Sequence, residues 1–221
     1  MPASAAVVPA VATAPALPVV EALQPVLPAG IRRGSTVAVS GSMSLLLAVV
    51  AAATVEGSWC ALVGMPPIGA DAAVEQGVVL SRLPVVPAPG DRWPTVVGAL
   101  LDAVDVVIAR PPTRLSDGEI RRLAARTRAR GSVLVPYLDA GARWPGADVR
   151  LCAGRRHWSG IEAGYGRLRR RRLTVTAEGR GTAARSRSVT LWLPADDGGC
   201  APALAPVAPD RPAELTVARA G

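Results

Sequence analysis

The turn after the first apolar run of the chain carries the residue types of a weak anion site. Residues 40–47 read Ser-Gly-Ser-Met-Ser-Leu-Leu-Leu. A phosphate-binding loop at this place needs glycines for a nest of backbone N–H groups, a lysine for the β- and γ-phosphates, and a serine or threonine for Mg²⁺. Gly41, Ser42 and Ser44 form a degenerate version, because leucines replace the lysine and the metal-binding hydroxyl. We therefore expect no tight ATP binding, and at most a weak anion at the following helix N-terminus.

Two further requirements of a nucleotide-hydrolysing site are missing. A carboxylate at the end of the central strand normally holds the water shell of the metal, but the run 106–108 leads into Ala109 and Arg110. A general base is expected after the second strand, where residues 63–67 (Val-Gly-Met-Pro-Pro) offer none. The sequence therefore predicts no catalytic residue, no bound metal and no cofactor, in a sheet that keeps the architecture of a nucleotide site without its chemistry.

A cluster of arginines is the second candidate site. A stripe of arginines can neutralise nucleic-acid phosphates, and Trp158 and Tyr165 could stack on the bases of a single strand. The alternatives are an acidic protein partner, or a solvated hairpin surface whose arginines pair with acidic neighbours. No base-reading motif is present, so any nucleic-acid binding should be independent of sequence. The cluster comprises Arg155, Arg156, Arg167, Arg169, Arg170, Arg171 and Arg172.

The tryptophans divide into expected core residues and expected anchors for a partner. Trp59 and Trp192 lie within apolar runs, which predicts that they are buried. Trp93 stands at a helix start and Trp144 in a loop, where aromatic side chains can anchor a protein partner. His157 is the one histidine of the chain, and beside Trp158 we expect it to have a structural role.

Composition restricts the class of protein. The chain has 221 residues, 50% of them hydrophobic, and a formal net charge of +8 that comes from arginine, because lysine does not occur. This apolar content excludes wholesale disorder, and the charge favours a polyanion or an acidic partner. The three cysteines are scattered without a CxxC pair, which argues against a disulfide framework or a zinc site. We expect a cytoplasmic protein, associated with the nucleoid when it is in a complex.

Strands and helices are expected to alternate along the first two thirds of the chain. Ser116 and Glu119 have the spacing of a capping box, and Gly131 is a natural helix end. This order predicts an α/β fold, with a mainly parallel sheet flanked by helices. A short strand is expected at 148–152. Two further strands, at 173–176 and 188–193, predict an antiparallel C-terminal hairpin. The earlier strands are expected at 36–40, 59–63, 104–109 and 133–138, and the helices at 44–54, 70–76, 91–101 and 117–130.

Residues 26–195 are expected to form a single domain. Residues 1–25 are rich in alanine and proline and are interpreted as a flexible N-terminal arm, either a mobile tail or a loosely docked segment, and residues 196–221 as a disordered tail. The uncharged run 37–55 is long enough to cross a bilayer. A strand followed by a buried helix is the better interpretation, because Ser-Gly-Ser interrupts its first half. We therefore expect no membrane segment.

The order of these features resembles the RecA core. The segment Leu27–Gly34, the run 76–83 and the strand pair 172–176 and 188–191 follow one another as in that fold. Over about residues 26–195 the chain more closely resembles the actinobacterial RecA-like accessory protein of the mutagenic polymerase cassette, the ImuA-prime type. The stretches similar to that family are 57–60, 63–66, 69–73, 87–93, 110–112, 157–160 and 191–194.

This resemblance implies a catalytically silent RecA-like fold that supports damage-induced, error-prone translesion synthesis. The implied partners are an ImuB-like, inactive relative of the Y-family polymerases and an error-prone C-family polymerase assembly. Two other functions stay open. One is a sequence-independent DNA-binding module, and the other is a divergent RecA-like ATPase or recombinase with an unusual loop.

Overall fold

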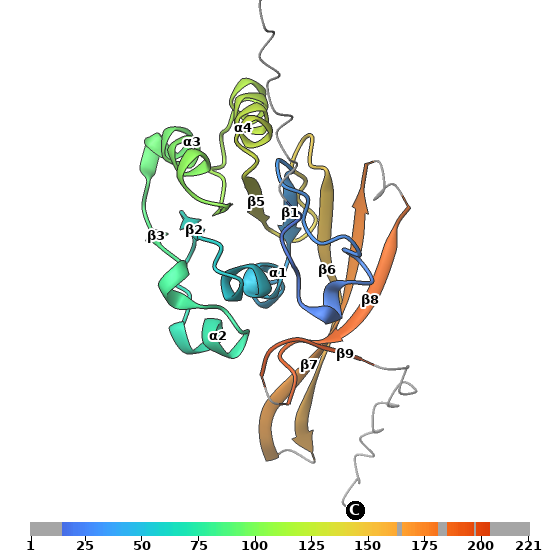
Figure 1. The fold of residues 1–221 in the computed structure, drawn as a ribbon. Helices are drawn as coiled ribbons and strands as arrows, with labels where there is room; N and C mark the ends of the chain where they lie inside the picture. Colours follow the sequence, from blue (N-terminus) through green and yellow to red (C-terminus); the bar gives the residue numbers. More distant parts are fainter. Residues whose placement is uncertain (1–14, 163–164, 181–184, 197, 204–221) are drawn as a thin grey trace, which may run out of the picture.

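The computed structural model describes residues 15–162, 165–180, 185–196 and 198–203, which form one nine-stranded sheet (Figure 1). Its strand order is β3-β2-β4-β5-β1-β6-β7-β8-β9. All pairs from β3 to β6 are parallel, and all pairs from β6 to β9 are antiparallel. The prediction of a mainly parallel sheet with an antiparallel C-terminal part is confirmed. The parallel strands are β1 (Val37–Ser40), β2 (Cys60–Val63), β3 (Val85–Val86), β4 (Val106–Ala109) and β5 (Val133–Leu138).

Helices cover both faces of the parallel strands. Helix α1 (Met43–Val55) packs on one face with Val37 and Val39, whereas α3 (Trp93–Ala103) and α4 (Asp117–Arg130) pack on the other with Ala38. The division follows from the alternation of side chains along a strand. The short helix α2 (Ala70–Glu75) follows β2. The run 37–55 is thus a strand and a 13-residue helix, as expected, and the described helices include none with the length and apolar character needed to span a bilayer.

Helix α4 has the ends that its sequence predicts. The Ser116 side chain accepts a hydrogen bond from the Glu119 amide, and the Glu119 carboxylate accepts one from the Ser116 amide, so the capping box is confirmed. The Ser116 hydroxyl also donates to the Glu119 carboxylate, and this bond, followed by the one from the Ser116 amide, lowers the pKa of the Glu119 carboxyl. Gly131 ends the helix with a φ of 68°, a conformation that glycine adopts without a steric cost.

The N-terminal segment differs from the expected flexible arm. Leu17 and Ile31 exchange two backbone hydrogen bonds of 2.8 Å, and a short 3-10 helix follows at Glu21–Leu23. Leu17 and Leu23 are buried in the same apolar cluster as α1. Residues 15–25 are therefore a docked segment rather than a mobile tail, because their leucines and valines pack on the apolar cluster. Residues 1–14 lie outside the described part of the chain.

The C-terminal segment also packs further than expected. Strand β9 (Ala201–Pro202) pairs with β8 (Arg187–Trp192), and the Gln76 amide donates to the Gly199 carbonyl at 3.5 Å. Cys200 packs against the main apolar cluster. The expectation of a disordered tail is thus wrong for the described residues 196 and 198–203. The remainder, 204–221, lies outside the described part.

Docking of the N-terminal segment can be tested by a leucine truncation. Leu23 is fully buried, and Leu23→Ala should lower the free energy of unfolding by about 2–5 kcal/mol. Leu80, which is 42% exposed, provides the matched control, and Leu80→Ala should cost about 1 kcal/mol or less. Urea denaturation followed by circular dichroism measures both. Equal costs for the two variants would show that the segment contributes no core packing.

Candidate functional site

The turn between β1 and α1 lies at the carboxyl edge of the parallel strands, the edge at which open α/β sheets bind ligands. Ser42 caps α1, and its hydroxyl accepts a hydrogen bond from the Leu45 amide at 3.3 Å. Gly41 has a φ of +81°, and a Cβ there would lie 3.3 Å from the Ala153 carbonyl oxygen. The positive φ and this close approach both require glycine, so the geometry of the degenerate loop depends on Gly41.

The three leucines after this turn point into the core. Leu45, Leu46 and Leu47 are all buried and belong to the main apolar cluster of the protein. A lysine or a metal-binding hydroxyl at these positions would have to be buried among aliphatic side chains, which is costly without a charged partner. The first turn of α1 therefore presents backbone groups and small hydroxyls to this edge.

Two arginines from the C-terminal strands reach the same turn. They come from β6 (Val149–Glu162) and β7 (Tyr165–Gly179). Arg171 donates from Nη2 to the Ser42 hydroxyl at 3.1 Å and from Nε to the Leu193 carbonyl at 2.9 Å. Arg156 donates from Nη2 to the Gly41 carbonyl at 3.3 Å. Burial, and then the nearby charge of Arg156, lower the pKa of the Arg171 guanidinium. Positive charge thus reaches the turn between β1 and α1 from another part of the chain.

Strands β6 and β7 are much longer than the sequence suggested. Strand β6 pairs with β1 through Cys152 and continues past the end of β1, so residues 154–162 and the β7 residues 165–172 that pair with them extend beyond the carboxyl edge (Figure 1). We call residues 154–162 and 165–172 the arginine arm. A bulge follows Ala153, and Trp158 lies opposite Arg171. The Arg171 guanidinium sits 5.3 Å from the Trp158 ring centre. Arg156, Trp158 and Arg171 therefore form one surface, which we call the inner face of the arm.

The outer face of the arginine arm has partners of its own. The Arg170 guanidinium pairs with Asp196 at 2.6 Å and lies over the Trp192 ring at 4.3 Å. For Arg170 the alternative of a solvated hairpin arginine paired with an acidic neighbour is therefore the better description. Arg155 is exposed and Arg172 half-buried. Arg167 and Arg169 belong to strand β7, but their side chains lie outside the described part of the structure.

The ends of β4 and β5 complete this edge. Strand β4 ends at Ala109, and the next residue, Arg110, pairs with Asp139 at 3.0 Å. Tyr137 lies nearby in β5, and burial raises the pKa of its hydroxyl. The Asp139 carboxylate is therefore already paired with the Arg110 guanidinium. The charges around this edge are mainly positive.

The predictions made for three of the tryptophans are wrong. Trp93 and Trp144 are only 3% and 5% exposed and pack in the cluster between the sheet and α3–α4. Neither can serve as an exposed anchor for a partner, because both side chains are buried between the sheet and these helices. Trp59, expected in the core, is 43% exposed with Arg82 stacked at 5.0 Å from its ring centre. Trp59 precedes β2 rather than lying inside it, which explains its exposure.

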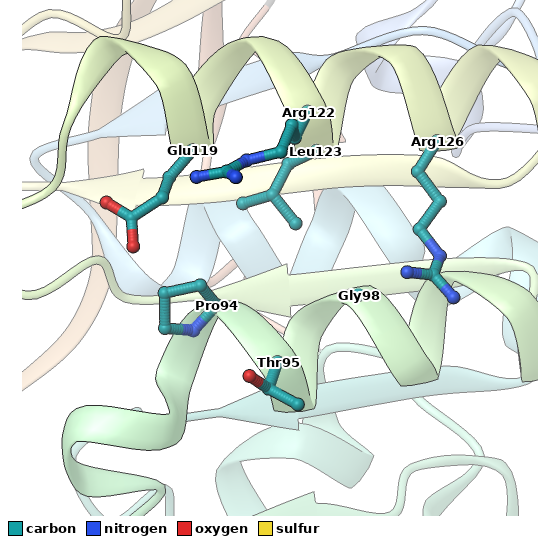
Figure 2. A pocket seen from close by; sticks show the side chains of 7 residues that line it. All are labelled: Pro94, Thr95, Gly98, Glu119, Arg122, Leu123 and Arg126. Atoms are coloured by element: carbon teal, nitrogen blue, oxygen red, sulfur yellow. The ribbon is translucent and has the colours of Figure 1, made fainter.

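Two hollows lie elsewhere on the described surface. One, of about 310 Å³, separates α3 from α4 (Figure 2) and is lined by Pro94, Thr95, Gly98, Glu119, Arg122, Leu123 and Arg126. Arg126 is held there by a two-pronged ion pair with Asp102, which lowers the pKa of that carboxyl to about 2. The other, of about 520 Å³, is apolar and lies beside edge strand β3, with Met65, Ile68, Leu83 and Val85 in its wall.

The arrangement defines a protein with a RecA-like fold. The described sheet and helices superpose on the RadB recombinase with a TM-score of 0.56 at 14% identity, covering 80% of this chain and 95% of that one. The flagellar accessory protein FlaH from Methanocaldococcus jannaschii matches with a TM-score of 0.50 at 11% identity, covering 76% and 89%. At these identities the likeness shows the fold alone, and it confirms the predicted RecA-like core.

Residues 25–146 match the model of the MT3502 N-terminal domain family, and the chain belongs to that family. The uncharacterized protein Rv3395c from Mycobacterium tuberculosis (strain ATCC 25618 / H37Rv) is 39% identical over 132 residues, which are 59% of this chain. The matched region spans 63% of the length of that relative. The arginine arm begins after the family match ends, so it lies outside the matched domain.

Thiol chemistry provides a check on the packing of the core, because Cys60 and Cys200 are the cysteines with raised pKa values. Burial raises the pKa of both thiols from 9.0 to about 12. At about pH 8 both should therefore resist alkylation by iodoacetamide in the native protein and react in urea, as measured by mass spectrometry. Unfolded thiols ionise first, so stability should fall as pH rises from 9.0 toward about 12. Fast native labelling of Cys60 or Cys200 would contradict this.

Proposed function

We propose that this protein is a non-catalytic RecA-like adaptor that supports damage-induced, error-prone translesion DNA synthesis. Its proposed partners are an ImuB-like relative of the Y-family polymerases and, through it, an error-prone C-family polymerase assembly. The observation that carries the proposal is the turn 41–47, where buried leucines replace the lysine and metal-binding hydroxyl. Membership of the MT3502 N-terminal domain family and the resemblance to the ImuA-prime type support the pathway.

The turn argues against the alternative of a divergent ATPase. Phosphoryl transfer needs a cation on the β- and γ-phosphates, a held metal ion and a positioned water or base. The Ser42 hydroxyl is already a helix cap and accepts from Arg171. The residue after β4 is an arginine, where a metal site would need a carboxylate. An arginine pair can hold an anion, but it supplies neither the metal nor the base.

An adaptor needs a surface for a protein partner, and the edge of the sheet at β3 has suitable chemistry. Leu80 and Val85 are exposed and line the apolar hollow beside β3. Exposed apolar side chains that gather at a concave surface are typical of protein contacts. We propose that the ImuB-like partner covers this edge.

The partner contact is tested by co-purification of the full chain with the ImuB-like protein and by titration calorimetry. Val85, 55% exposed, lines the hollow, and Val85→Asp should weaken the complex about tenfold or more by placing a charge in an apolar contact. Val55→Asp is the matched control, because Val55 is 67% exposed at the end of α1, and it should bind as the unaltered chain does. Failure of the unaltered chain to associate would overturn the adaptor proposal.

Nucleotide binding is tested separately by thermal unfolding. A ligand that binds the native state at 100 times its Kd adds about 2.7 kcal/mol of stability. We expect no shift of the melting temperature with MgATP and no ATP turnover. A clear upward shift that Gly41→Ala or Ser42→Ala removes would instead support the divergent ATPase.

A further inference from the structure

The arginine arm places a concentrated positive charge beyond the carboxyl edge of the sheet. Between residues 154 and 172 the chain has seven arginines and a single acidic residue, Glu162. Its two strands are paired with each other, with Ser159 opposite Arg170 and Ile161 opposite Gly166 and a bulge between these two pairs. The backbone therefore holds these charges on a two-stranded ribbon rather than on a loop, so the cost of ordering them is already met by folding.

The two arginines of the inner face have neutral partners. Arg156 donates to the Gly41 carbonyl, and Arg171 donates to the Ser42 hydroxyl and the Leu193 carbonyl. Neither guanidinium belongs to an ion pair among the residues that the structure describes. The Asp139 carboxylate, which follows β5 at this edge, pairs with Arg110. Two like charges thus approach one turn, and an anion between them would relieve their repulsion.

An exposed aromatic ring lies beside one of these charges. Trp158 is 41% exposed and stands opposite Arg171 in the ribbon, with its ring 5.3 Å below that guanidinium. His157 and Arg156 precede it and are also exposed. Aromatic rings set in a positively charged groove bind single strands by stacking with the bases while arginines hold the phosphates. A free phosphate would use the arginines alone, and an acidic peptide has no planar group that requires the ring.

We propose that the inner face of the arginine arm, Arg156, Trp158 and Arg171, binds single-stranded nucleic acid without sequence preference. The arginines contact the phosphates and Trp158 stacks on a base. A paired duplex keeps its bases stacked inside, so it engages the arginines without the ring and binds less tightly. This surface is distinct from the β3 edge assigned to the protein partner, and loss of one contact leaves the other intact.

The test is fluorescence anisotropy of a labelled oligothymidylate, about 20 nucleotides long, with the full chain at low salt. Arg156→Gln with Arg171→Gln should raise Kd about tenfold or more and flatten the plot of log affinity against log salt by about 1.4, for two lost phosphate contacts. Trp158→Ala should raise Kd about 5- to 100-fold with little change in that slope.

The matched control removes the same charge from α4. Arg121 and Arg128 are exposed on that helix and form no ion pair with other described residues, and Arg121→Gln with Arg128→Gln should leave Kd within about twofold. Arg171 is half-buried, so urea unfolding of each variant accompanies the binding data. If the double variant is unfolded, Arg156→Gln with Trp158→Ala replaces it, because both side chains are exposed.

Several outcomes would overturn the proposal. No binding of the oligonucleotide by the unaltered chain at low salt would do so, as would an equal loss in the α4 control. Displacement by polyglutamate as effective as by unlabelled oligonucleotide would assign the face to an acidic protein. Displacement by micromolar MgATP would assign it to a free nucleotide. Tighter binding of the duplex than of the single strand would remove the role of Trp158.

Discussion

The burial of helix α1 is the constraint on which the rest of the structure depends. From Leu45 to Ala51 every residue of this helix is buried. A helix that is apolar on all sides needs cover beyond the one face of a sheet. The N-terminal segment with Leu17 and Leu23 belongs to the same apolar cluster, and so do Leu173 and Leu191 of the C-terminal strands. Both ends of the described chain are therefore tied to α1, and the sheet alone does not account for its packing.

The same constraint explains the chemistry of the turn before α1. The positions at which a phosphate loop has its lysine and metal-binding hydroxyl are the positions at which this helix enters the core. A cationic side chain at Leu46 or Leu47 would be buried among apolar residues. Burying an unpaired ion costs on the order of several kcal/mol. Apolar packing and phosphate chemistry compete for the same residues, and packing prevails here.

The sequence predicted the parallel part of the fold well because its signals are local. Apolar runs between turn residues located β1, β2, β4 and β5, and the Ser116–Glu119 spacing located the start of α4. Hydrophobic pattern and capping act over one or two helical turns, so a single sequence contains them.

The errors have a common origin in long-range packing. Residues 15–25 and 198–203 are rich in alanine, proline or glycine, which is typical of tails. Leu17 and Leu23 nevertheless pack in the apolar cluster of α1, and Ala201 and Pro202 pair with β8. Trp93 and Trp144 are buried because two helices and a sheet enclose them. The arginine arm contains a polar run that is typical of a loop, and only pairing between residues about 13 apart, such as Trp158 with Arg171, makes it a ribbon.

The arginine arm changes what the carboxyl edge can recognise. A phosphate loop places its cation on a short, rigid turn and binds a compact ligand whose charge is shared with a metal ion. Here the cations come from strands that continue past the edge, and they are accompanied by a ring rather than by a metal-binding carboxylate. Guanidinium groups spaced along a ribbon fit a ligand whose anionic groups are also spaced along its length, because each guanidinium then contacts a separate anion. On the proposal above, the edge that binds ligands in this kind of sheet binds an extended ligand here rather than a compact one.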